Sequence, residues 1–240
     1  MQIIVPAAGN GTRFSEQGYR EPKPLVKVLN KPLIRWSTGG LNIKNNPKYI
    51  FLVQQSHIEQ YHIDQRLSEW YDNCAVIPVE GVTEGQACTV LLAKDMLDLE
   101  DELAIVNCDN LFSIDLNRAK KELKINDDSR GIVFFIAGNN PAWSYVATDK
   151  NGFATQVAEK IVISDKATVG CYYFTKAKYF VEAAELMIER DIRYNGEFYV
   201  SPTYNIFIED GKKVHTWPCD FHFSLGTPEQ VDSFLSLFKN

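Results

Sequence analysis

The chain reads Val5-Pro6-Ala7-Ala8-Gly9-Asn10-Gly11-Thr12-Arg13-Phe14 near its start, and Glu21-Pro22-Lys23-Pro24 follows shortly after. The preceding run of β-branched residues predicts a short strand that stops at a proline and small residues. Glycines at two positions of the loop tolerate positive φ, so successive backbone N–H groups can face an anion. Arg13 adds a planar fork of donors, and Lys23 adds a point charge on a loop stiffened by prolines. The stretch therefore predicts a cradle for the phosphates of a nucleotide.

Two common glycine-rich loops do not match this pattern. A dinucleotide-binding fingerprint requires a third glycine where Phe14 stands, and a Walker loop requires Gly-Lys followed by Ser or Thr. Gly-x-Gly alone more often marks a structural turn. The Thr-Arg-Phe that follows it, and then Pro22-Lys23-Pro24, make the pattern specific.

Together these residues resemble the signature of the sugar-phosphate nucleotidyltransferases, also called nucleoside-diphosphate-sugar pyrophosphorylases. That signature is a strand, Gly-x-Gly-Thr-Arg, a variable loop and then Pro-Lys-Pro-Leu. The resemblance implies that Arg13 binds the departing pyrophosphate and that Lys23 stabilises charge at the reacting phosphate. It also implies a set of residues that hold the nucleotide: Ala7, Ala8, Gly9, Asn10, Gly11 and Thr12.

Composition restricts the class of protein. A chain of 240 residues with 45% hydrophobic and 23% charged residues is typical of a soluble globular domain. The net charge of −6 argues against nucleic acid as a partner. No apolar run is long enough for a membrane span, and Met1 leads directly into a strand, so we expect a cytoplasmic protein with no membrane partner. The cysteines and histidines show no zinc-ligand spacing, and most cysteines are expected to be reduced core residues.

The order of the predicted elements indicates an α/β fold. Apolar runs at 49–53, 75–79, 102–106 and 131–136 are typical of buried strands, and helices are expected between them at 32–39, 57–70, 85–92 and 114–123. This predicts a Rossmann-like, GT-A-like mixed sheet, mostly parallel and flanked by helices. A hairpin at 144–157, a strand at 168–174 and helices at 177–190 and 231–238 follow. We expect a single domain, 1–240, with a nucleotide-binding half at 1–137 and a small β-rich acceptor-binding portion at 138–240.

Two positions lie where a parallel sheet presents side chains to a ligand. Gln86 follows Gly85 at the start of a predicted helix, and we expect it to recognise the base; a plain polar helix start is the alternative. Asp109 follows a predicted strand and is the best candidate for a Mg²⁺ ligand, because magnesium takes one or two carboxylates and completes its shell with phosphate and water. The alternative is a helix cap for the segment from Leu111 onward.

The acceptor side depends more on the resemblance. It implies that Lys160 binds the acceptor's phosphate with Glu159 as its polar partner, although a Glu-Lys pair is usually solvated surface. It also implies that Asn195 and Glu197 hydrogen-bond to hydroxyl or amino groups of the acceptor. Many relatives carry Asp-x-Gly-Thr-Pro with the aspartate as a second metal ligand. Ser224 stands there in this chain, and Asp220 is the available substitute.

The implied reaction is attack by an acceptor phosphate oxygen on the α-phosphorus of a nucleoside triphosphate, with release of pyrophosphate. The segments 6–9, 195–200 and 225–228 are similar to capsule-locus members of the family, which include cytidylyltransferases acting on L-glutamine phosphate. CTP is therefore expected ahead of UTP, and the acceptor is a sugar 1-phosphate or L-glutamine phosphate. Whether the chain forms a homo-oligomer stays open.

Two other classes of function are weighed against this one. A nucleotide-sugar-dependent glycosyltransferase would favour an Asp-x-Asp metal motif, and Asn107-Cys108-Asp109 lacks the first aspartate. A non-catalytic nucleotide-binding regulatory module is the other alternative. Arg13, Lys23 and Asp109 together disfavour it, because they are the residues that the chemistry requires.

Overall fold

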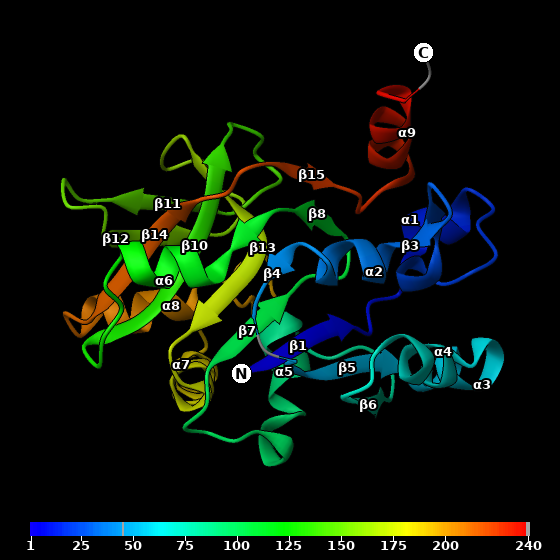
Figure 1. Cartoon of the computed structure of the whole chain (residues 1–240), viewed down its shortest axis with the longest axis horizontal. Coiled ribbons are helices and arrows are strands. Elements are labelled where there is room, and N and C mark those ends of the chain that lie inside the picture. The colour runs from blue at the N-terminus through cyan, green and yellow to red at the C-terminus, as the bar shows by residue number, and fades with distance from the viewer. Residues whose placement is uncertain (45, 239–240) are drawn as a thin grey trace.

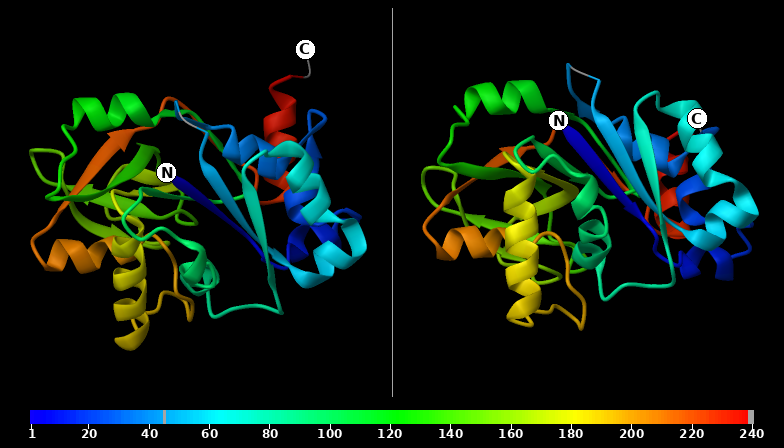
Figure 2. Two further views of the ribbon diagram at one scale, coloured as in Figure 1. Left: turned by 60° about the horizontal axis from the view of Figure 1, so that its bottom comes forward. Right: turned by 90° about the horizontal axis from the view of Figure 1, so that it is seen from below.

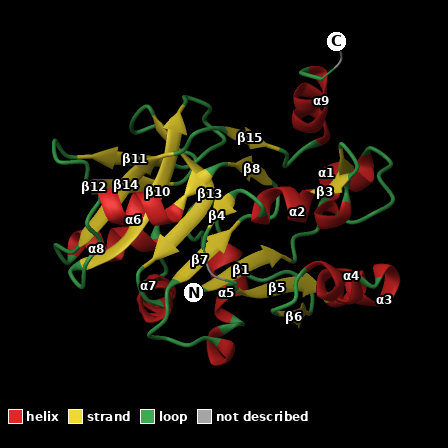
Figure 3. Ribbon diagram, viewed as in Figure 1, coloured by secondary structure: helices red, strands yellow, loops and turns green. Residues whose placement is uncertain are grey.

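A central sheet with helices on both faces forms the body of the molecule (Figure 1). The computed structural model describes residues 1–44 and 46–238. Figure 3 shows that strands dominate the middle and the part that carries β11, β12 and β14, whereas helices cover the outside. The predicted α/β fold with a large mixed sheet is confirmed.

The main sheet has nine strands, and its path runs β12-β11-β13-β7-β1-β5-β6. β10 pairs with β13 and with β14 off this path. The strands are β1 (Gln2–Ala7), β5 (Lys48–Gln54), β6 (Cys74–Val79), β7 (Leu103–Val106), β10 (Ser129–Ala137), β11 (Tyr145–Thr148), β12 (Ala154–Ala158), β13 (Lys166–Phe174) and β14 (Lys213–Pro218). β6, β5, β1 and β7 run parallel, and β13 joins them antiparallel to β7.

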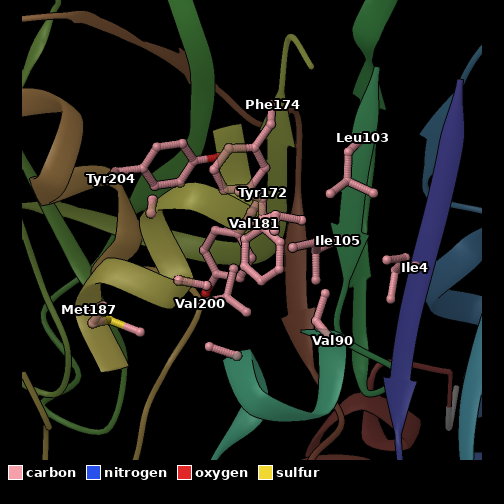
Figure 4. Packing of buried hydrophobic residues seen from close by; sticks show 14 of the residues in the cluster. Ile4, Val90, Leu103, Ile105, Tyr172, Phe174, Val181, Met187, Val200 and Tyr204 are labelled. Atoms are coloured by element: carbon pink, nitrogen blue, oxygen red, sulfur yellow. The ribbon is translucent and has the colours of Figure 1, made fainter. Parts of the chain in front are cut away.

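The strands of the parallel part are apolar on both faces, which explains their continuous hydrophobic runs. In β1, Ile4 points into one core, and Ile3 and Val5 point into a second core on the opposite face. The first core lies under α5 (Gln86–Leu91), α7 (Ala177–Glu189) and α8 (Thr203–Glu209), and Figure 4 shows Ile4, Val90 and Tyr204 within it. The second lies under α2 (Leu33–Thr38), α4 (Ile63–Trp70) and α6 (Leu116–Glu122). Figure 2 shows α5 and α7 on the face opposite α6.

Several predicted helices are confirmed, and three details differ. The helix expected at 57–70 is two helices, α3 (Gln55–Tyr61) and α4, because His62 between them adopts a left-handed conformation with φ of 50°. The helix expected at 114–123 begins at Leu116, where the Asp115 side chain caps it by accepting from the Arg118 N–H. No signal in the sequence analysis indicated α8.

Most of the shorter elements surround the carboxyl end of the parallel strands, whereas the 3₁₀ turn η2 (Lys94–Met96) lies at their amino end, where the Lys48 Nζ donates to the Met96 carbonyl. β8 (Asn110–Phe112) pairs with β15 (His222–Ser224), and α9 (Pro228–Ser236) follows β15. The others are α1 (Thr12–Glu16), β2 (Lys27–Val28), β3 (Lys31–Pro32), β4 (Leu41–Asn42), β9 (Ile114–Asp115) and the 3₁₀ turn η1 (Lys23–Leu25). Within the described residues, no helix has the length and apolar character that crossing a bilayer requires.

Candidate active site

The loop after β1 lies directly over Lys23. Gly11 has φ of 61°, and a Cβ at this position would come 3.1 Å from the Cβ of Lys23, so the close approach and the backbone both favour glycine. Gly9 does not have a positive φ, and a Cβ there would meet nothing within 4 Å, so of the two glycines only Gly11 uses the left-handed conformation that both tolerate. An open position of this kind leaves room for a ligand close to the backbone.

Gln54 fixes the far side of this loop. Its Nε2 donates to the Ala8 carbonyl at 2.9 Å and to Oδ1 of Asn10 at 2.9 Å. Gln54 is not among the predicted site residues, although a polar residue at the carboxyl end of the parallel strand β5 is a usable signal. The Oδ1 of Asn10 therefore helps to hold the loop in place.

Lys23 and Asp109 form an ion pair below the loop. The Lys23 Nζ lies 2.5 Å from Oδ2 of Asp109, and each side chain is about one fifth exposed, at 22% and 21%. Burial by itself would lower the pKa of Lys23, but the carboxylate of Asp109 raises it above its ordinary value. Burial raises the pKa of the Cys108 thiol to about 12, so that thiol stays protonated. The ammonium of Lys23 is therefore a permanent positive charge at this point.

Two strands outside the main sheet hold Asp109. Its Oδ1 accepts from Nδ2 of Asn110 at 3.0 Å, and its backbone carbonyl accepts from the Leu225 N–H at 2.8 Å. The next residue, Gly226, approaches so closely that a Cβ there would lie 2.8 Å from Oδ2 of Asp109. Residues 110–112 form a strand, so the alternative that Asp109 caps a helix from Leu111 is wrong.

Asp220 does not lie beside Asp109. In the β8–β15 pair, Ser224 lies opposite Asn110, whereas the Asp220 N–H bonds to the carbonyl of Ser113. Ser113 lies four residues beyond Asp109, past the end of β8, and four residues of extended chain span roughly 13 Å. The expectation that Asp220 replaces the relatives' second metal aspartate is corrected on this geometry. Across the described residues, no group of three or more His, Cys, Asp or Glu forms a ready-made metal site.

Gln86 stands at the first position of α5, and Gly85 places it there. Gly85 has φ of 140°, and a Cβ would come within 2.5 Å of the Phe198 backbone. Backbone bonds of 2.9 Å join Ala87 N–H to the Phe198 carbonyl and Phe198 N–H to the Glu84 carbonyl. The Gln86 Nε2 donates to Oδ1 of Asn107 at 2.6 Å. The start of α5 is thus tied both to β7 and to the segment around Phe198.

Three cavities meet at Gln86, and a fourth lies beside them. The loop cavity, about 150 Å³, is lined by Pro6, Ala7, Gly9, Gly11, Lys23, Pro24, Gln86, Asn107, Cys108 and Asp109. The flank cavity, about 340 Å³, is lined by Pro6, Ala8, Gly9, Asn10, Val82, Thr83, Gly85, Gln86, Thr89 and Glu197. The rim cavity, about 190 Å³, is lined by Gly11, Thr12, Arg13, Phe14, Lys23 and Gly226. Every predicted nucleotide-binding residue, with Arg13 and Lys23, lines the loop cavity, the flank cavity or the rim cavity.

The hairpin cavity, about 300 Å³, lies between Asp109 and the β11–β12 hairpin. Its lining comprises Gln86, Asn107, Asp109, Asn110, Ala142, Trp143, Ser144, Glu159, Thr168, Gly170, Tyr172, Tyr199, His222 and Ser224. It shares Gln86, Asn107 and Asp109 with the loop cavity. Of these residues the sequence analysis named only Gln86, Asp109 and Glu159 for the site, because the others come together through long-range strand pairing.

The four predicted acceptor residues take different places. Glu159 is buried and lines the hairpin cavity, where its Oε2 accepts from the hydroxyls of Ser144 and Ser201. Lys160 is exposed, and its Nζ donates to the Tyr199 hydroxyl at 2.6 Å on the wall of that cavity. Asn195 occupies an exposed turn with φ of 51°, outside the lining of the hairpin cavity. Glu197 lines the flank cavity, so the structure places it beside the nucleotide-binding residues.

The comparison with known families decides what this arrangement belongs to. The model of the nucleotidyl transferase family matches residues 2–204, which is most of the chain. The chain belongs to the nucleotidyl transferase family. The predicted family membership is therefore confirmed, and the matched range includes the glycine loop, Lys23, Gln86 and Asp109.

Curated members of the nucleotidyl transferase family resemble this chain at modest identity. A UTP–glucose-1-phosphate uridylyltransferase, AglF, of Haloferax volcanii is 24% identical over 97% of this chain and 94% of its own length. The bifunctional protein GlmU of Methanocaldococcus jannaschii is 27% identical over 58% of this chain. The chain spans only 34% of that second relative, so GlmU carries further sequence that has no counterpart here.

Solved structures show the same fold. A nucleoside-diphosphate-sugar pyrophosphorylase from Vibrio cholerae superposes with a TM-score of 0.82 at 22% identity and covers 98% of this chain and 99% of its own. The inositol-1-phosphate CTP transferase of T. maritima superposes with a TM-score of 0.75 at 14% identity, covering 98% of this chain and 92% of its own. At these identities the likeness establishes the GT-A-like fold.

Proposed function

We propose that the chain moves a nucleoside monophosphate from a nucleoside triphosphate to the phosphate of a small acceptor and releases pyrophosphate. The observation that carries this proposal is the junction of the loop cavity with the hairpin cavity at Gln86, Asn107 and Asp109, next to the Lys23 ammonium. A triphosphate in the loop cavity and an acceptor in the hairpin cavity can meet only there. The α-phosphorus and the attacking oxygen would then both lie beside the Lys23 ammonium.

The residues suit a reaction whose difficulty is charge. The acceptor is already an anion, so no general base is needed, and the task is to hold negative groups together and stabilise developing charge. Lys23 offsets charge at the α-phosphate, and Arg13 in the rim cavity receives the leaving pyrophosphate. Backbone N–H groups of the glycine loop hold the remaining phosphate oxygens without reorganising. A nucleophile with an activating histidine is not required.

Asp109 fits a magnesium ion that arrives with the triphosphate. One protein carboxylate is enough for magnesium when phosphates and water supply the other ligands, and Asp109 provides it at the cavity junction. When bound, the ion would offset charge on the phosphate oxygens. Ser224, which pairs with Asn110 between β15 and β8, lines the hairpin cavity but carries no charge.

The flank cavity supports cytosine as the base, with uracil next. Because the Gln86 Nε2 donates to Asn107, its Oε1 is left to accept a hydrogen bond. Glu197 adds a carboxylate acceptor to the same cavity. The exocyclic amino group of cytosine donates where uracil presents a carbonyl. CTP is therefore the favoured donor, in keeping with the T. maritima relative whose name specifies CTP.

The acceptor is a sugar 1-phosphate or L-glutamine phosphate. Glucose 1-phosphate and inositol 1-phosphate appear in the names of relatives. Glu159 and Lys160 are proposed to contact the acceptor, and Glu197 is reassigned to the nucleotide side. A role in capsule or surface polysaccharide synthesis in the cytoplasm completes the proposal.

The deciding experiment is pyrophosphate release with magnesium, measured for each of the four common ribonucleoside triphosphates crossed with sugar 1-phosphates and L-glutamine phosphate. We expect release with CTP and one acceptor, and none without acceptor. Release of nucleoside diphosphate from a nucleotide sugar alone would instead indicate a glycosyltransferase. Tight nucleotide binding with no turnover for any pair would indicate a regulatory module.

A further inference from the structure

Glu159 is a buried carboxylate with one oxygen left over. The residue is 7% exposed, and its Oε2 accepts from both Ser144 and Ser201. Within the described residues no hydrogen bond reaches its Oε1, and since Oε1 is not among the buried polar atoms without a partner, it faces the hairpin cavity. Burial raises the pKa of this carboxyl, whereas the two serine hydroxyls and the charge of the nearby Lys160 lower it. Oε1 is therefore the oxygen that a donor or a cation entering the hairpin cavity can reach.

The hairpin cavity supplies no cation of its own. Among the described residues that line it there is no lysine or arginine, and the other carboxylate, Asp109, is paired with Lys23. Burial lowers the pKa of His222 to about 4, so this imidazole is neutral at pH 7. Lys160 follows Glu159 in sequence, but its Nζ donates to Tyr199 at 2.6 Å and it lies outside the lining.

Aromatic rings form much of the remaining wall. Trp143, Tyr172 and Tyr199 all line the hairpin cavity. The Tyr199 ring already carries a cation on its face, because the Lys160 Nζ lies 4.7 Å from the ring centroid. Aromatic faces beside a carboxylate are the arrangement by which proteins bind ammonium groups.

The two ends of the hairpin cavity lie near different strands of the sheet. Asp109 follows β7, and Ser144, which bonds to Glu159, precedes β11. β13 lies between β7 and β11, so these ends are two strand spacings apart, roughly 10 Å. An acceptor with its phosphate at the cavity junction, beside the Lys23–Asp109 pair, would extend several bonds before reaching Glu159.

We propose that the acceptor carries an ammonium group at the end away from its phosphate, and that Glu159 binds this group among Trp143, Tyr172 and Tyr199. The inference rests on the proposed transfer to a phosphorylated acceptor and narrows its substrate class to aminated phosphates. It places a carboxylate–ammonium contact, and not a hydroxyl contact, at the inner end of the hairpin cavity.

The test uses probe pairs in which one member lacks the cation. Phosphocholine is compared with 3,3-dimethylbutyl phosphate, in which carbon replaces the quaternary nitrogen, and L-glutamine phosphate with its N-acetyl derivative. Binding to the whole protein is measured by calorimetry, and pyrophosphate release with CTP and magnesium is measured in parallel. We expect at least one ammonium probe to bind tenfold or more tightly than its neutral partner. Equal binding within both pairs overturns the proposal, as does turnover restricted to neutral sugar 1-phosphates.

Glu159→Gln identifies the residue responsible. The variant keeps an acceptor oxygen for the serines but loses the charge, so the preference for the ammonium probe should fall at least tenfold while binding of the neutral partner changes little. Glu182→Gln, an exposed position on α7, is the matched control. Equal loss for both probes would mean that Glu159 only maintains the cavity, which overturns the assignment. Cation-selective binding without pyrophosphate release would retain the ammonium site and reject the proposed transfer.

Discussion

At the scale of single residues, the ion pair between Lys23 and Asp109 combines two roles that the sequence suggested separately. Each residue was predicted from its own motif, but nothing in either motif indicated that the two side chains touch. The contact exists because η1 and the end of β7 meet beneath the glycine loop. Motifs therefore predicted these residue types, whereas their coupling required the fold.

Lys23→Ala should lose most turnover, on the order of 100-fold or more, because the charge acts where negative charge develops. Binding of the triphosphate should weaken much less. Steady-state kinetics and calorimetry separate the two effects. Lys27→Ala, an exposed lysine on the adjacent strand β2, is the control and should behave as the parent. Parent-like turnover in Lys23→Ala would remove Lys23 from the mechanism.

Asp109→Asn should raise the magnesium concentration required for half-maximal turnover by about tenfold, since the substitution keeps size and removes the charge. Asp220→Asn should leave the same titration unchanged, because Asp220 lies beside Ser113, past the end of β8 that is far from Asp109. A magnesium titration compares the two. A shift in Asp220→Asn, with none in Asp109→Asn, would mean that Asp220 binds the magnesium and that Asp109 does not.

At the scale of elements, sequence patterns predict strands and helices but not which segments they contact. Gly85 was recognised as a helix start. Its tight contact with the Phe198 backbone, which carries Glu197 to the flank cavity, was not visible in the sequence. The break between α3 and α4 also escaped prediction, because His62 is neither glycine nor proline and its left-handed φ has no compositional signal.

Gly85→Ala should displace the start of α5 and with it Gln86. A Cβ would lie 2.5 Å from backbone atoms of Phe198, so the strand-like contact must open. We expect a loss of stability of about 1–3 kcal/mol and a clear rise in the Michaelis constant for the triphosphate. Gly81→Ala is the matched control, because Gly81 also has positive φ, at 67°, with open space around it. Urea unfolding and kinetics on both variants check this; equal effects would mean that backbone conformation alone matters.

At the scale of the whole molecule, the parallel part of the sheet was predictable and the antiparallel part less so. Strands buried on both faces are continuous apolar runs, which is why β5 and β7 stand out in the sequence. The position of β13 between β7 and β11 depends on pairing between residues far apart in the chain. The hairpin cavity forms across that pairing, which explains why most of its lining was missed. The division into halves at 137 stays a prediction.

Buried histidines should make stability depend on pH. Burial lowers the pKa of His57 and of His215 below the ordinary value. As pH falls through about 6.5, the unfolded chain takes up protons that the folded protein does not, so the free energy of unfolding should decrease. Urea unfolding between pH 7.5 and 5.5 measures the slope. His215→Gln should flatten it, and an unchanged slope would exclude His215 as a contributor.

The antiparallel insertion of β13 also has a consequence for how the chain folds. β7 is made early in synthesis, but its hydrogen-bonding edge toward β13 is covered only after residues 166–174 have emerged. Until then the nascent chain carries an exposed strand edge, a template for pairing with other chains. Pairing over such a sequence separation also slows folding, because loop closure must precede the contacts that reward it. Pairing of β13, which helps to form the hairpin cavity, thus also covers the edge of β7 and removes a site for aggregation.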